Sequence, residues 1–497
     1  MKLEKNKVAL IILDGWGISP DKKISAIEHA NIPFIKNLYN SYPHTALQAS
    51  GEYVGLPKGQ MGNSEVGHMT IGAGRVIDTD LVRINKSITS SQFFQHEKLK
   101  KIAEKIKFTK KNLHIIGLMS DGGIHSHIDH FFSLIKFLKL HNIKFFTHAI
   151  TDGRDSSIDY LKKNFLEINK KIESYGGKLS TIIGRFFAMD RDKNWDRTNI
   201  AFESFINGNG EHCENFLEKI NDFYEKKIYD EFLPPLISSE NKNNINNGDT
   251  VIFLNYRTDR VKQLASKFIE KSSYDLYSFV DYGFENGIEK IFEREKIKNS
   301  LNEVLVKNNL EQLRIAETEK FAHVTYFFDC ETQDERNERN ILCNSPKQKT
   351  YDLVPEMAAH AISEKLLNAI EEKKYDFICI NYANADMVGH TGNFSATVKA
   401  CETIDEALKK IIPSLLEKNY TILLTADHGN ADKMIGSTGK ICTTHSLNLV
   451  PFILIDKYLN KEKINLNKNS TLADIAPTIL KLLNIKKPKE MTGKSIF

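Results

Sequence analysis

Short, continuous apolar runs recur along the whole chain, and each ends in a polar loop that contains glycine or a charged residue. Continuous apolarity is typical of strands in a parallel sheet that helices cover on both faces. Helical patterns lie between the runs, so the chain is predicted to adopt an α/β fold with a mainly parallel sheet. The predicted strands are 8–13, 113–118, 145–150, 179–183, 251–254, 377–380, 421–424 and 451–455, and the predicted helices are 131–140, 357–372, 398–412 and 472–483. The apolar run 321–328 is interpreted as a further strand.

Length and charge limit the classes of protein that the chain can belong to. A chain of 497 residues exceeds what one hydrophobic core usually organises, so two domains are expected. Lysine and arginine total 68 against 64 acidic residues, a net charge of +4. This balance argues against a nucleic-acid or membrane-surface partner. Any anionic ligand must therefore be bound by a local cluster of basic residues.

The cysteines and the amino-terminal segment indicate the compartment. The six cysteines have no paired spacing and are expected to be reduced. The apolar run 8–13 is too short for a signal peptide or a membrane span. A cytoplasmic location without membrane attachment is therefore expected.

Charged residues follow seven of the predicted strands. Ligands of parallel α/β sheets bind at the carboxyl ends of the strands, so these residues are candidates for binding or catalysis. They are Asp14, Asp121, His125, Asp152, Arg154, Asp155, Arg185, Arg257, Asp386 and Asp427.

A glycine-bounded stretch at 62–68 presents one serine among residues that cannot form a core. We interpret Ser64 as a nucleophile, although a serine hydroxyl needs a base or a metal to activate it and the stretch contains no obvious helper. The alternative is that Asn63 or Ser64 only caps a short helix, the commonest role of these residues after a loop.

Three aspartates and three histidines form a candidate metal-binding set. Asp386 and His390 are four residues apart and share one face of a helical turn. Asp427 and His428 directly follow a strand, and Asp14 and His445 complete the set. Taken singly, each is more often a surface, cap or core residue than a ligand. Together, oxygen and nitrogen donors without cysteine favour a pair of Mn²⁺ or Zn²⁺ ions over a structural zinc.

Five motifs spread over nearly the whole chain closely resemble the cofactor-independent phosphoglycerate mutase family, a branch of the alkaline phosphatase superfamily. They are Leu13-Asp14-Gly15-Trp16-Gly17, the stretch 62–68, the stretch 384–390, Asp427-His428-Gly429-Asn430 and Thr444-His445. The resemblance implies that one ion is held by Asp14, Ser64, Asp427 and His428, and the other by Asp386, His390 and His445. It implies two divalent ions, foremost Mn²⁺ with Zn²⁺, Co²⁺ or Mg²⁺ as alternatives, and no 2,3-bisphosphoglycerate.

Basic residues gather in four loops between these motifs. Because guanidinium groups bind carboxylate and phosphate oxygens bidentately, converging arginines suit a small, doubly anionic substrate. The alternative is that they are solvated and paired with nearby aspartates. The resemblance implies that the glycerate moiety is contacted by His125, Arg154, Asp155, Arg185, Arg191, Arg257 and Arg260. It also implies that Lys320 reaches the phosphoryl group.

The chain is also expected to divide into two domains, and one of its loops departs from the family pattern. A metal-binding, alkaline-phosphatase-like domain is expected at 1–75 and 315–497, interrupted by an inserted substrate-binding domain at 76–314, with hinges near 72–75 and 307–316. The family usually has a glycine pair after the run 321–328, whereas this chain has Asp329 and Cys330. This departure concerns the geometry of a loop and removes no expected ligand.

The expected function is interconversion of 3-phosphoglycerate and 2-phosphoglycerate, in glycolysis and gluconeogenesis, through a phosphoserine at Ser64. Asp155 is the candidate general acid and base. The alternatives are a metal-dependent phosphomonoesterase or phosphopentomutase of the same superfamily and, in another class, a non-catalytic binding protein. The arginine-rich segment favours a mutase over a simple phosphatase. A monomer is expected.

Overall fold

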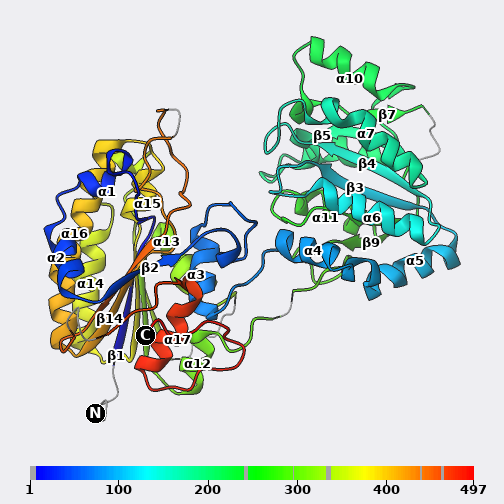
Figure 1. Cartoon of the computed structure of the whole chain (residues 1–497). Helices are drawn as coiled ribbons and strands as arrows, with labels where there is room; N and C mark the ends of the chain where they lie inside the picture. Colours follow the sequence, from blue (N-terminus) through cyan, green and yellow to red (C-terminus); the bar gives the residue numbers. More distant parts are fainter. Residues whose placement is uncertain (1–6, 240–243, 295, 332–336, 437–438, 460–463) are drawn as a thin grey trace. The chain divides into compact units, whose positions relative to one another are not determined.

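The chain folds into two compact units (Figure 1). The computed structural model describes residues 7–239, 244–294, 296–331, 337–436, 439–459 and 464–497. Unit 1 comprises residues 1–79 and 296–497, and unit 2 comprises residues 80–295. Each unit has its own hydrophobic core.

The second boundary differs clearly from the expectation at 314/315. Helix α12, Leu301–Lys307, packs Leu301 and Leu305 into the core of unit 1. Strand β11, Gln312–Glu317, pairs with two other strands of unit 1. The chain therefore leaves unit 1 between residues 79 and 80, whereas the expected boundary was 75/76. It returns to unit 1 between residues 295 and 296.

Unit 1 is built on a sheet with the strand order β12-β11-β13-β1-β14-β15-β2-β16. Pairing is parallel except where β15 meets β14 and β2. The strands are β1 Lys7–Leu13, β2 His44–Gln48, β11, β12 Glu338–Cys343, β13 Phe377–Tyr382, β14 Tyr420–Thr425, β15 Val450–Ile455 and β16 Ser470–Thr471. The helices are α1 Ala26–His29, α2 Pro33–Ser41, α3 Ser64–Ala73, α12, α13 Thr318–Ala322, α14 Ala359–Glu372, α15 Asn384–Gly389, α16 Phe394–Glu417 and α17 Ile475–Leu482.

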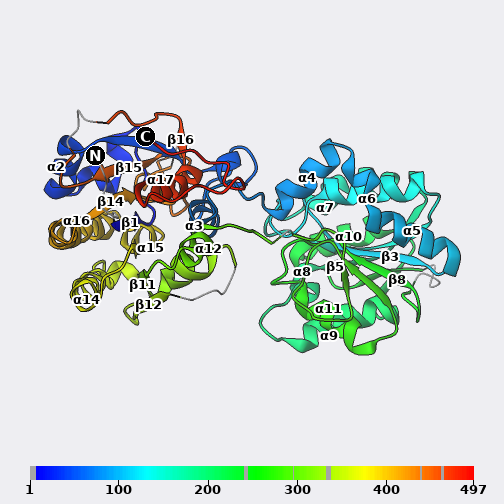
Figure 2. The ribbon, with the colours of Figure 1, turned by 90° about the horizontal axis from the view of Figure 1, so that it is seen from below.

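Helices cover both faces of this sheet. Helices α14 and α16 lie on one face, and α3, α12 and α17 lie on the other (Figures 1 and 2). Strands β1, β13 and β14 are buried along almost their whole length. The two helical layers explain why these central strands have continuous apolar runs.

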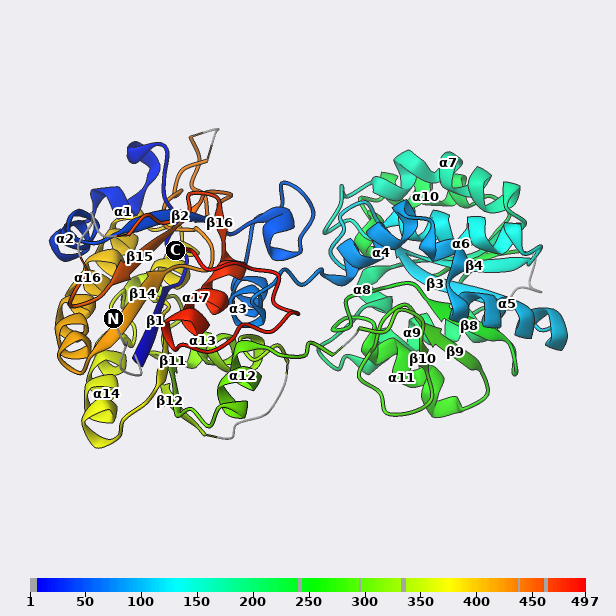
Figure 3. The same cartoon turned by 60° about the horizontal axis from the view of Figure 1, so that its bottom comes forward.

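Unit 2 contains a second sheet, with the strand order β10-β9-β8-β3-β4-β5-β7-β6. Helices α6 and α7 lie on one face of it, and α9 and α11 lie on the other (Figure 3). The strands are β3 Leu113–Met119, β4 Phe145–Thr151, β5 Gly177–Gly184, β6 Glu211–Cys213, β7 Leu236–Ser238, β8 Thr250–Phe253, β9 Asp275–Ser278 and β10 Glu289–Lys290. The helices are α4 Asp80–Thr89, α5 Glu97–Thr109, α6 Ile128–Leu140, α7 Tyr160–Ser174, α8 Arg185–Ala188, α9 Trp195–Ile206, α10 Phe216–Glu225 and α11 Lys262–Lys271.

The predicted fold class and all eight apolar strands listed first are confirmed, apart from small shifts at their ends. The predicted helices correspond to α6, α14, part of α16, and a 3₁₀ turn at Leu472–Asp474 followed by α17. The interpretation of 321–328 as a strand is wrong, because this run forms the end of α13 and a π-helical turn at His323–Phe327. Its apolar side chains pack against α3 and the core rather than into a sheet.

The two segments predicted to act as hinges lie within unit 1. Gly72 is part of α3, and a side chain there would lie 1.8 Å from the carbonyl oxygen of Phe328. This glycine therefore permits close packing of α3 on the π-helical turn. Residues 307–316 span the end of α12 and most of β11. Neither segment coincides with a connection between the units.

The loop without the glycine pair has two left-handed residues. Cys330 and Glu331 have φ angles of +60° and +63°. L-amino acids other than glycine are disfavoured in this region because Cβ approaches the following carbonyl oxygen. Cys330 is buried, whereas Glu331 is exposed.

Replacing Glu331 with glycine is therefore expected to stabilise unit 1. Relief of the left-handed strain outweighs the extra entropy of the unfolded glycine, for a net gain of about 0.5–1 kcal/mol. Thermal and urea unfolding, followed by the fluorescence of Trp16 in a Trp195→Phe background, measures the change. A Glu371→Gly control in α14 should instead lose stability, and a lower unfolding midpoint for Glu331→Gly contradicts the prediction.

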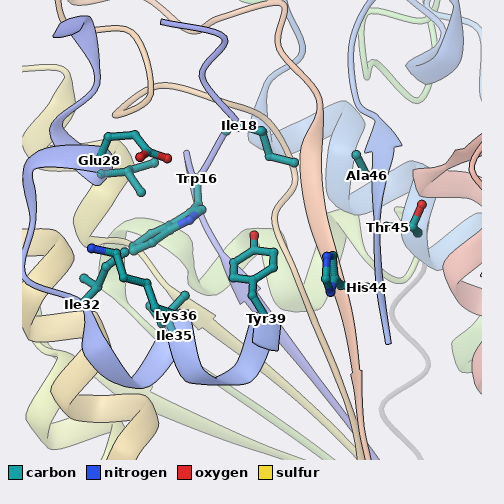
Figure 4. Close-up of a pocket in the computed structure, with 12 residues that line it drawn as sticks. Trp16, Ile18, Glu28, Ile32, Ile35, Lys36, Tyr39, His44, Thr45 and Ala46 are labelled. Atoms are coloured by element: carbon teal, nitrogen blue, oxygen red, sulfur yellow. The ribbon is translucent and has the colours of Figure 1, made fainter. Parts of the chain in front are cut away.

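A pocket of about 510 Å³ opens beside the loop that follows β1 (Figure 4). Its wall includes Trp16, Ile32, Ile35 and Tyr39, and the hydroxyl group of Tyr39 points into it.

Trp16 is 3% exposed and lies two residues after Asp14. The other tryptophan, Trp195, belongs to α9 of unit 2. Each unit thus has its own fluorescent reporter.

Two expectations from composition can be compared with the structure. The six cysteines, which all lie in the described residues, are free thiols, as predicted. Among the helices that the structure describes, none has the length and apolarity needed to cross a membrane.

Candidate functional site

Three neighbouring parallel strands of unit 1 bring the acidic residues of the predicted metal set together. Asp14 follows β1, Asp386 lies in α15 just after β13, and Asp427 follows β14. Strand β1 pairs in parallel with both β13 and β14. Because parallel strands end at the same edge of a sheet, residues far apart in sequence meet there.

One potential metal-binding group consists of Asp14, Asp427 and His428, whose donor atoms lie within 4.8 Å of one another. Ser64 adjoins this group. Its Oγ is 3.2 Å from Asp14 Oδ1 and 3.0 Å from His428 Nε2. The structure thus brings together the four residues that the family resemblance assigns to one ion.

The second potential metal-binding group consists of Asp386, His428 and His445, with donor atoms again within 4.8 Å of one another. His390 lies at its edge, with Nε2 3.3 Å from Asp386 Oδ1 and 3.0 Å from His445 Nε2. The geometry therefore places His428 between the two groups, whereas the resemblance assigns it to the first alone. The helical turn that carries Asp386 and His390 is formed as predicted.

The chemistry of these residues fits divalent cations. All three carboxylates are nearly or fully buried, and burial of unpaired negative charge is costly. Asp427 Oδ2 is buried and has no hydrogen bond within the described part of the chain. Aspartate oxygens and imidazole nitrogens are donors that Mn²⁺ and Zn²⁺ accept.

Lys320 is the basic side chain at the centre of the site. It comes from α13, directly after β11, and is 4% exposed. Its Nζ donates hydrogen bonds to Asp14 Oδ1 at 2.7 Å, Asp386 Oδ2 at 2.7 Å and Ser64 Oγ at 2.6 Å. Burial alone lowers the pKa of Lys320, but the surrounding aspartates raise it above its ordinary value. Lys320 is therefore a permanent cation beside the serine.

Helix α3 presents Ser64 at its first position. The Asn63 side chain caps the helix by accepting a hydrogen bond from the Val66 amide. The predicted capping role thus belongs to Asn63 and leaves the Ser64 hydroxyl available. Backbone N–H groups and the helix dipole favour an anion at such an N-terminus.

Electrostatic interactions keep the site charged. Burial acts to raise the pKa of Asp14, but Lys320 and His428 hold it well below its ordinary value. Burial acts to lower the pKa of His428, but Asp427, Asp14 and Asp386 raise it to about 9. Each cationic group thus stabilises the ionised aspartates around it.

The predicted substrate-binding residues, apart from Lys320, lie at one edge of the sheet in unit 2. His125 follows β3, Arg154 and Asp155 follow β4, and Arg185 begins α8 after β5. Arg257 and Arg260 follow β8, the neighbour of β3. The connections run in opposite directions from β3 and β8, and such switch points are where α/β sheets bind ligands. Arg257 and Arg260 lie in the loop before α11.

Arg185 organises one half of this basic cluster. It is 3% exposed, and its Nη1 lies 2.5 Å from Asp152 Oδ1 and 2.6 Å from Asp155 Oδ2. His125 Nε2 is 3.6 Å from the same Asp155 oxygen. Burial and the charge of Arg185 lower the pKa of His125 to about 4, so this imidazole is neutral at pH 7.

Asp259 organises the other half. Its Oδ2 accepts a hydrogen bond from Arg191 at 2.9 Å, and its Oδ1 is 3.3 Å from Arg257 Nε. Burial and the charges of Arg191, Arg185 and Arg154 lower the pKa of Arg260. The arginines therefore converge closely enough to repel one another, and this repulsion favours binding of an anion.

Several residues that contact these sites were not predicted. Asp152 was a candidate for binding or catalysis without an assigned role, whereas Asp259 was covered only by the alternative that nearby aspartates pair with the arginines. Asn381 and Asn430 donate hydrogen bonds to Asp14 and Asp386, respectively. His68 Nδ1 lies 3.2 Å from Asp427 Oδ2. Asn381 is the fifth residue of an otherwise apolar strand, a polar exception that marks it as unusual.

Comparison with known proteins agrees with this geometry. Residues 6–487 match the model of the metalloenzyme superfamily. The chain is 47% identical to the 2,3-bisphosphoglycerate-independent phosphoglycerate mutase of Gracilaria tenuistipitata var. liui, over 99% of this chain and 98% of that protein. It is 43% identical to the enzyme of that name from Clostridium botulinum, over the full length of both.

A solved structure supports the same relationship. The crystal structure of Leishmania mexicana phosphoglycerate mutase at low cobalt concentration is similar to this chain, with a TM-score of 0.72 and 28% identity. The alignment covers 100% of this chain and 98% of that one. The chain therefore belongs to the metalloenzyme superfamily and, within it, to the 2,3-bisphosphoglycerate-independent phosphoglycerate mutases.

Proposed function

We propose that this chain interconverts 3-phosphoglycerate and 2-phosphoglycerate through a phosphoserine at Ser64. The observation that carries the proposal is the position of the Ser64 hydroxyl, within 3.2 Å of Asp14, His428 and Lys320. Family membership supplies the substrate, because the relatives are named as phosphoglycerate mutases.

In the proposed reaction, Asp155 starts protonated and Ser64 reacts as its alkoxide, after its hydroxyl proton has passed to solvent. Ser64 Oγ then attacks phosphorus, and the alkoxide is regenerated when the phosphoryl group leaves again. The bond from serine oxygen to phosphorus forms, and the bond from phosphorus to the glycerate oxygen breaks. Asp155 donates a proton to the departing glycerate oxygen and later accepts one from the other hydroxyl group, which takes the phosphoryl group back. Lys320 balances negative charge on the phosphoryl oxygens.

Two divalent cations are proposed to bind in unit 1. One would be held by Asp14, Ser64, Asp427 and His428, and the other by Asp386, His390 and His445. When bound, such ions act as Lewis acids and lower the pKa of a coordinated hydroxyl group. His428 is close enough to both groups to contribute to either. Mn²⁺ is the proposed native ion, and Zn²⁺, Co²⁺ and Mg²⁺ are the alternatives for the assay below.

The basic cluster of unit 2 is proposed to bind the glycerate part of the substrate. Arginine forks match the carboxylate, and neutral His125 can exchange a hydrogen bond with a hydroxyl group. The cluster consists of His125, Arg154, Asp155, Arg185, Arg191, Arg257 and Arg260. Since one chain contains every residue of the scheme, we further propose that it works as a monomer. We also propose that it works in the cytoplasm.

Metal removal tests this function directly. After chelation, turnover of 3-phosphoglycerate in the absence of 2,3-bisphosphoglycerate is expected to fall by about 100-fold or more. Adding back Mn²⁺, Zn²⁺, Co²⁺ or Mg²⁺ singly should restore it, Mn²⁺ best. A coupled assay for 2-phosphoglycerate measures the rate.

A parallel assay for inorganic phosphate is the control. A mutase returns the phosphoryl group to glycerate, so 2-phosphoglycerate should form in large excess over phosphate. Phosphate release as the main reaction, or full activity in the chelated protein, contradicts the proposal.

A further inference from the structure

His68 lies one helical turn beyond Ser64 on α3, and the scheme above gives it no role. It is fully buried, and its Nδ1 is 2.9 Å from the Ser64 carbonyl oxygen and 3.2 Å from Asp427 Oδ2. On its other side, Nε2 is 3.1 Å from Asn381 Nδ2. One imidazole thus contacts the backbone of the nucleophile and a residue of the first metal-binding group.

Asn381 extends this chain of contacts to Asp14. It lies in β13, is fully buried, and its Nδ2 donates a hydrogen bond to Asp14 Oδ2 at 2.8 Å. Because a carboxylate oxygen only accepts, the amide nitrogen rather than the amide oxygen must face Asp14. The same NH₂ group therefore donates its second hydrogen to His68 Nε2.

The direction of these bonds fixes the tautomer of His68. Since Nε2 accepts a hydrogen bond, the proton of the neutral ring lies on Nδ1. That N–H donates to the Ser64 carbonyl and faces the Asp427 carboxylate. The contacts run without interruption from Asp14 through Asn381 and His68 to Asp427.

The packing of α3 leaves little freedom around this chain. A side chain at Gly67 would lie 2.8 Å from the Asp427 carbonyl oxygen, so the helix directly abuts the loop after β14. The ring of His323 lies 5.6 Å from that of His68. His68 is therefore enclosed on α3, with the Asp427 carboxylate at Nδ1 and the Asn381 amide at Nε2.

We propose that His68 and Asn381 are positioning residues that hold Asp14 and Asp427 in the geometry needed for metal binding, and that fix α3 with Ser64 beside them. This inference rests on the proposed metal centre. Residues behind the ligands of a metal site orient those ligands, and their loss typically costs about 10–100-fold in metal affinity or activity. Neither residue is expected to touch the substrate.

The test is metal binding to the metal-free protein, measured by isothermal titration with Mn²⁺. His68→Phe retains a buried ring and loses both hydrogen bonds, so the Kd of one of the two sites is expected to rise about 10–100-fold. The visible absorption spectrum of the Co²⁺ protein should change, because the geometry of the ligands changes. Activity should fall through kcat, with the KM for 3-phosphoglycerate changed by less than about threefold.

Conservative variants separate positioning from simple packing. In His68→Asn an amide nitrogen can replace Nδ1, and in His68→Gln an amide oxygen can replace Nε2, so each should recover part of the affinity. Asn381→Leu should weaken Mn²⁺ binding like His68→Phe. The double variant should be little worse than either single variant, because both remove one chain of bonds.

His130 supplies a matched control. It is a fully buried histidine in unit 2, and its Nε2 bonds Asn85 Oδ1 at 2.7 Å. His130→Phe should lose stability yet leave the Mn²⁺ affinity and the Co²⁺ spectrum unchanged. Equal effects of His130→Phe and His68→Phe on Mn²⁺ affinity would point to general destabilisation and overturn the inference.

The remaining outcomes are equally distinct. Unchanged Kd values and an unchanged Co²⁺ spectrum in His68→Phe overturn the positioning role while leaving the proposed function intact. Failure of the unsubstituted protein to bind Mn²⁺ instead overturns the proposed metal centre itself. If His68→Phe does not fold, Asn381→Leu decides, and wild-type affinity in that variant overturns the inference.

Discussion

Replacing Ser64 with alanine is expected to lower kcat by about 10⁴–10⁶-fold, the range found when a catalytic nucleophile is removed. Ser64 is 6% exposed, and its hydroxyl group is surrounded by Asp14, His428 and Lys320. A water molecule therefore has no equivalent position from which it could accept the phosphoryl group and return it. The rate of 2-phosphoglycerate formation measures this loss.

The same experiment can detect the intermediate. Wild-type protein quenched in acid during turnover should yield a phosphorylated peptide that contains Ser64, and Ser64→Ala should yield none. Ser41→Ala is the matched control, because Ser41 is exposed at the end of α2 in the same unit. Turnover by Ser64→Ala within tenfold of wild type, or phosphate on another residue, rules out the proposed mechanism.

Replacing Lys320 with methionine is expected to have two large effects. Loss of its cationic donor near the phosphoryl group should lower kcat by about 10²–10³-fold. In chelated protein, Asp14 and Asp386 would also be buried without their cationic partner. Breaking a buried ion pair in this way costs about 3–5 kcal/mol, so the free energy of unfolding should fall by that amount. Urea unfolding of the chelated protein measures the second effect.

Added Mn²⁺ distinguishes this electrostatic cause from lost packing. Divalent cations at the two metal-binding groups would neutralise the same carboxylates, so the stability difference between wild type and Lys320→Met should shrink when Mn²⁺ is present. Lys418→Met is the control, since Lys418 forms an exposed pair with Glu371 at 2.6 Å and should contribute at most about 1 kcal/mol. A difference that is the same with and without Mn²⁺ contradicts the prediction.

The position of the arginine residues in unit 2 could be predicted in part from the sequence. Their placement after predicted strands indicated a shared edge of a sheet, and the order of β3, β4, β5 and β8 puts them there. The alternative of paired arginines was also partly right, because Asp152, Asp155 and Asp259 bond several of them. The ion pairs hold the arginine side chains in place, and the cluster keeps a net positive charge.

Strand β11 was missed for a physical reason. It contains Arg314, whose guanidinium is buried between Asp329 at 3.2 Å and Glu338 at 3.4 Å. A charged residue of a buried ion pair interrupts the continuous apolar run by which a buried strand is recognised in a sequence. The predicted hinge at 307–316 includes most of this strand, which belongs to unit 1.

The sequence alone determined the α/β class, the strands that lie at the centre of both sheets, and the residue types of the metal-binding and substrate-binding sets. Those features depend on local apolar patterns and on motifs a few residues long. Only the tertiary structure decided that His428 lies between both metal-binding groups, that Lys320 bonds two aspartates and the serine, and that His68 and Asn381 connect Asp14 with Asp427. These contacts join residues from different strands and helices, and the direction of each hydrogen bond depends on side chains that meet only when the sheet assembles.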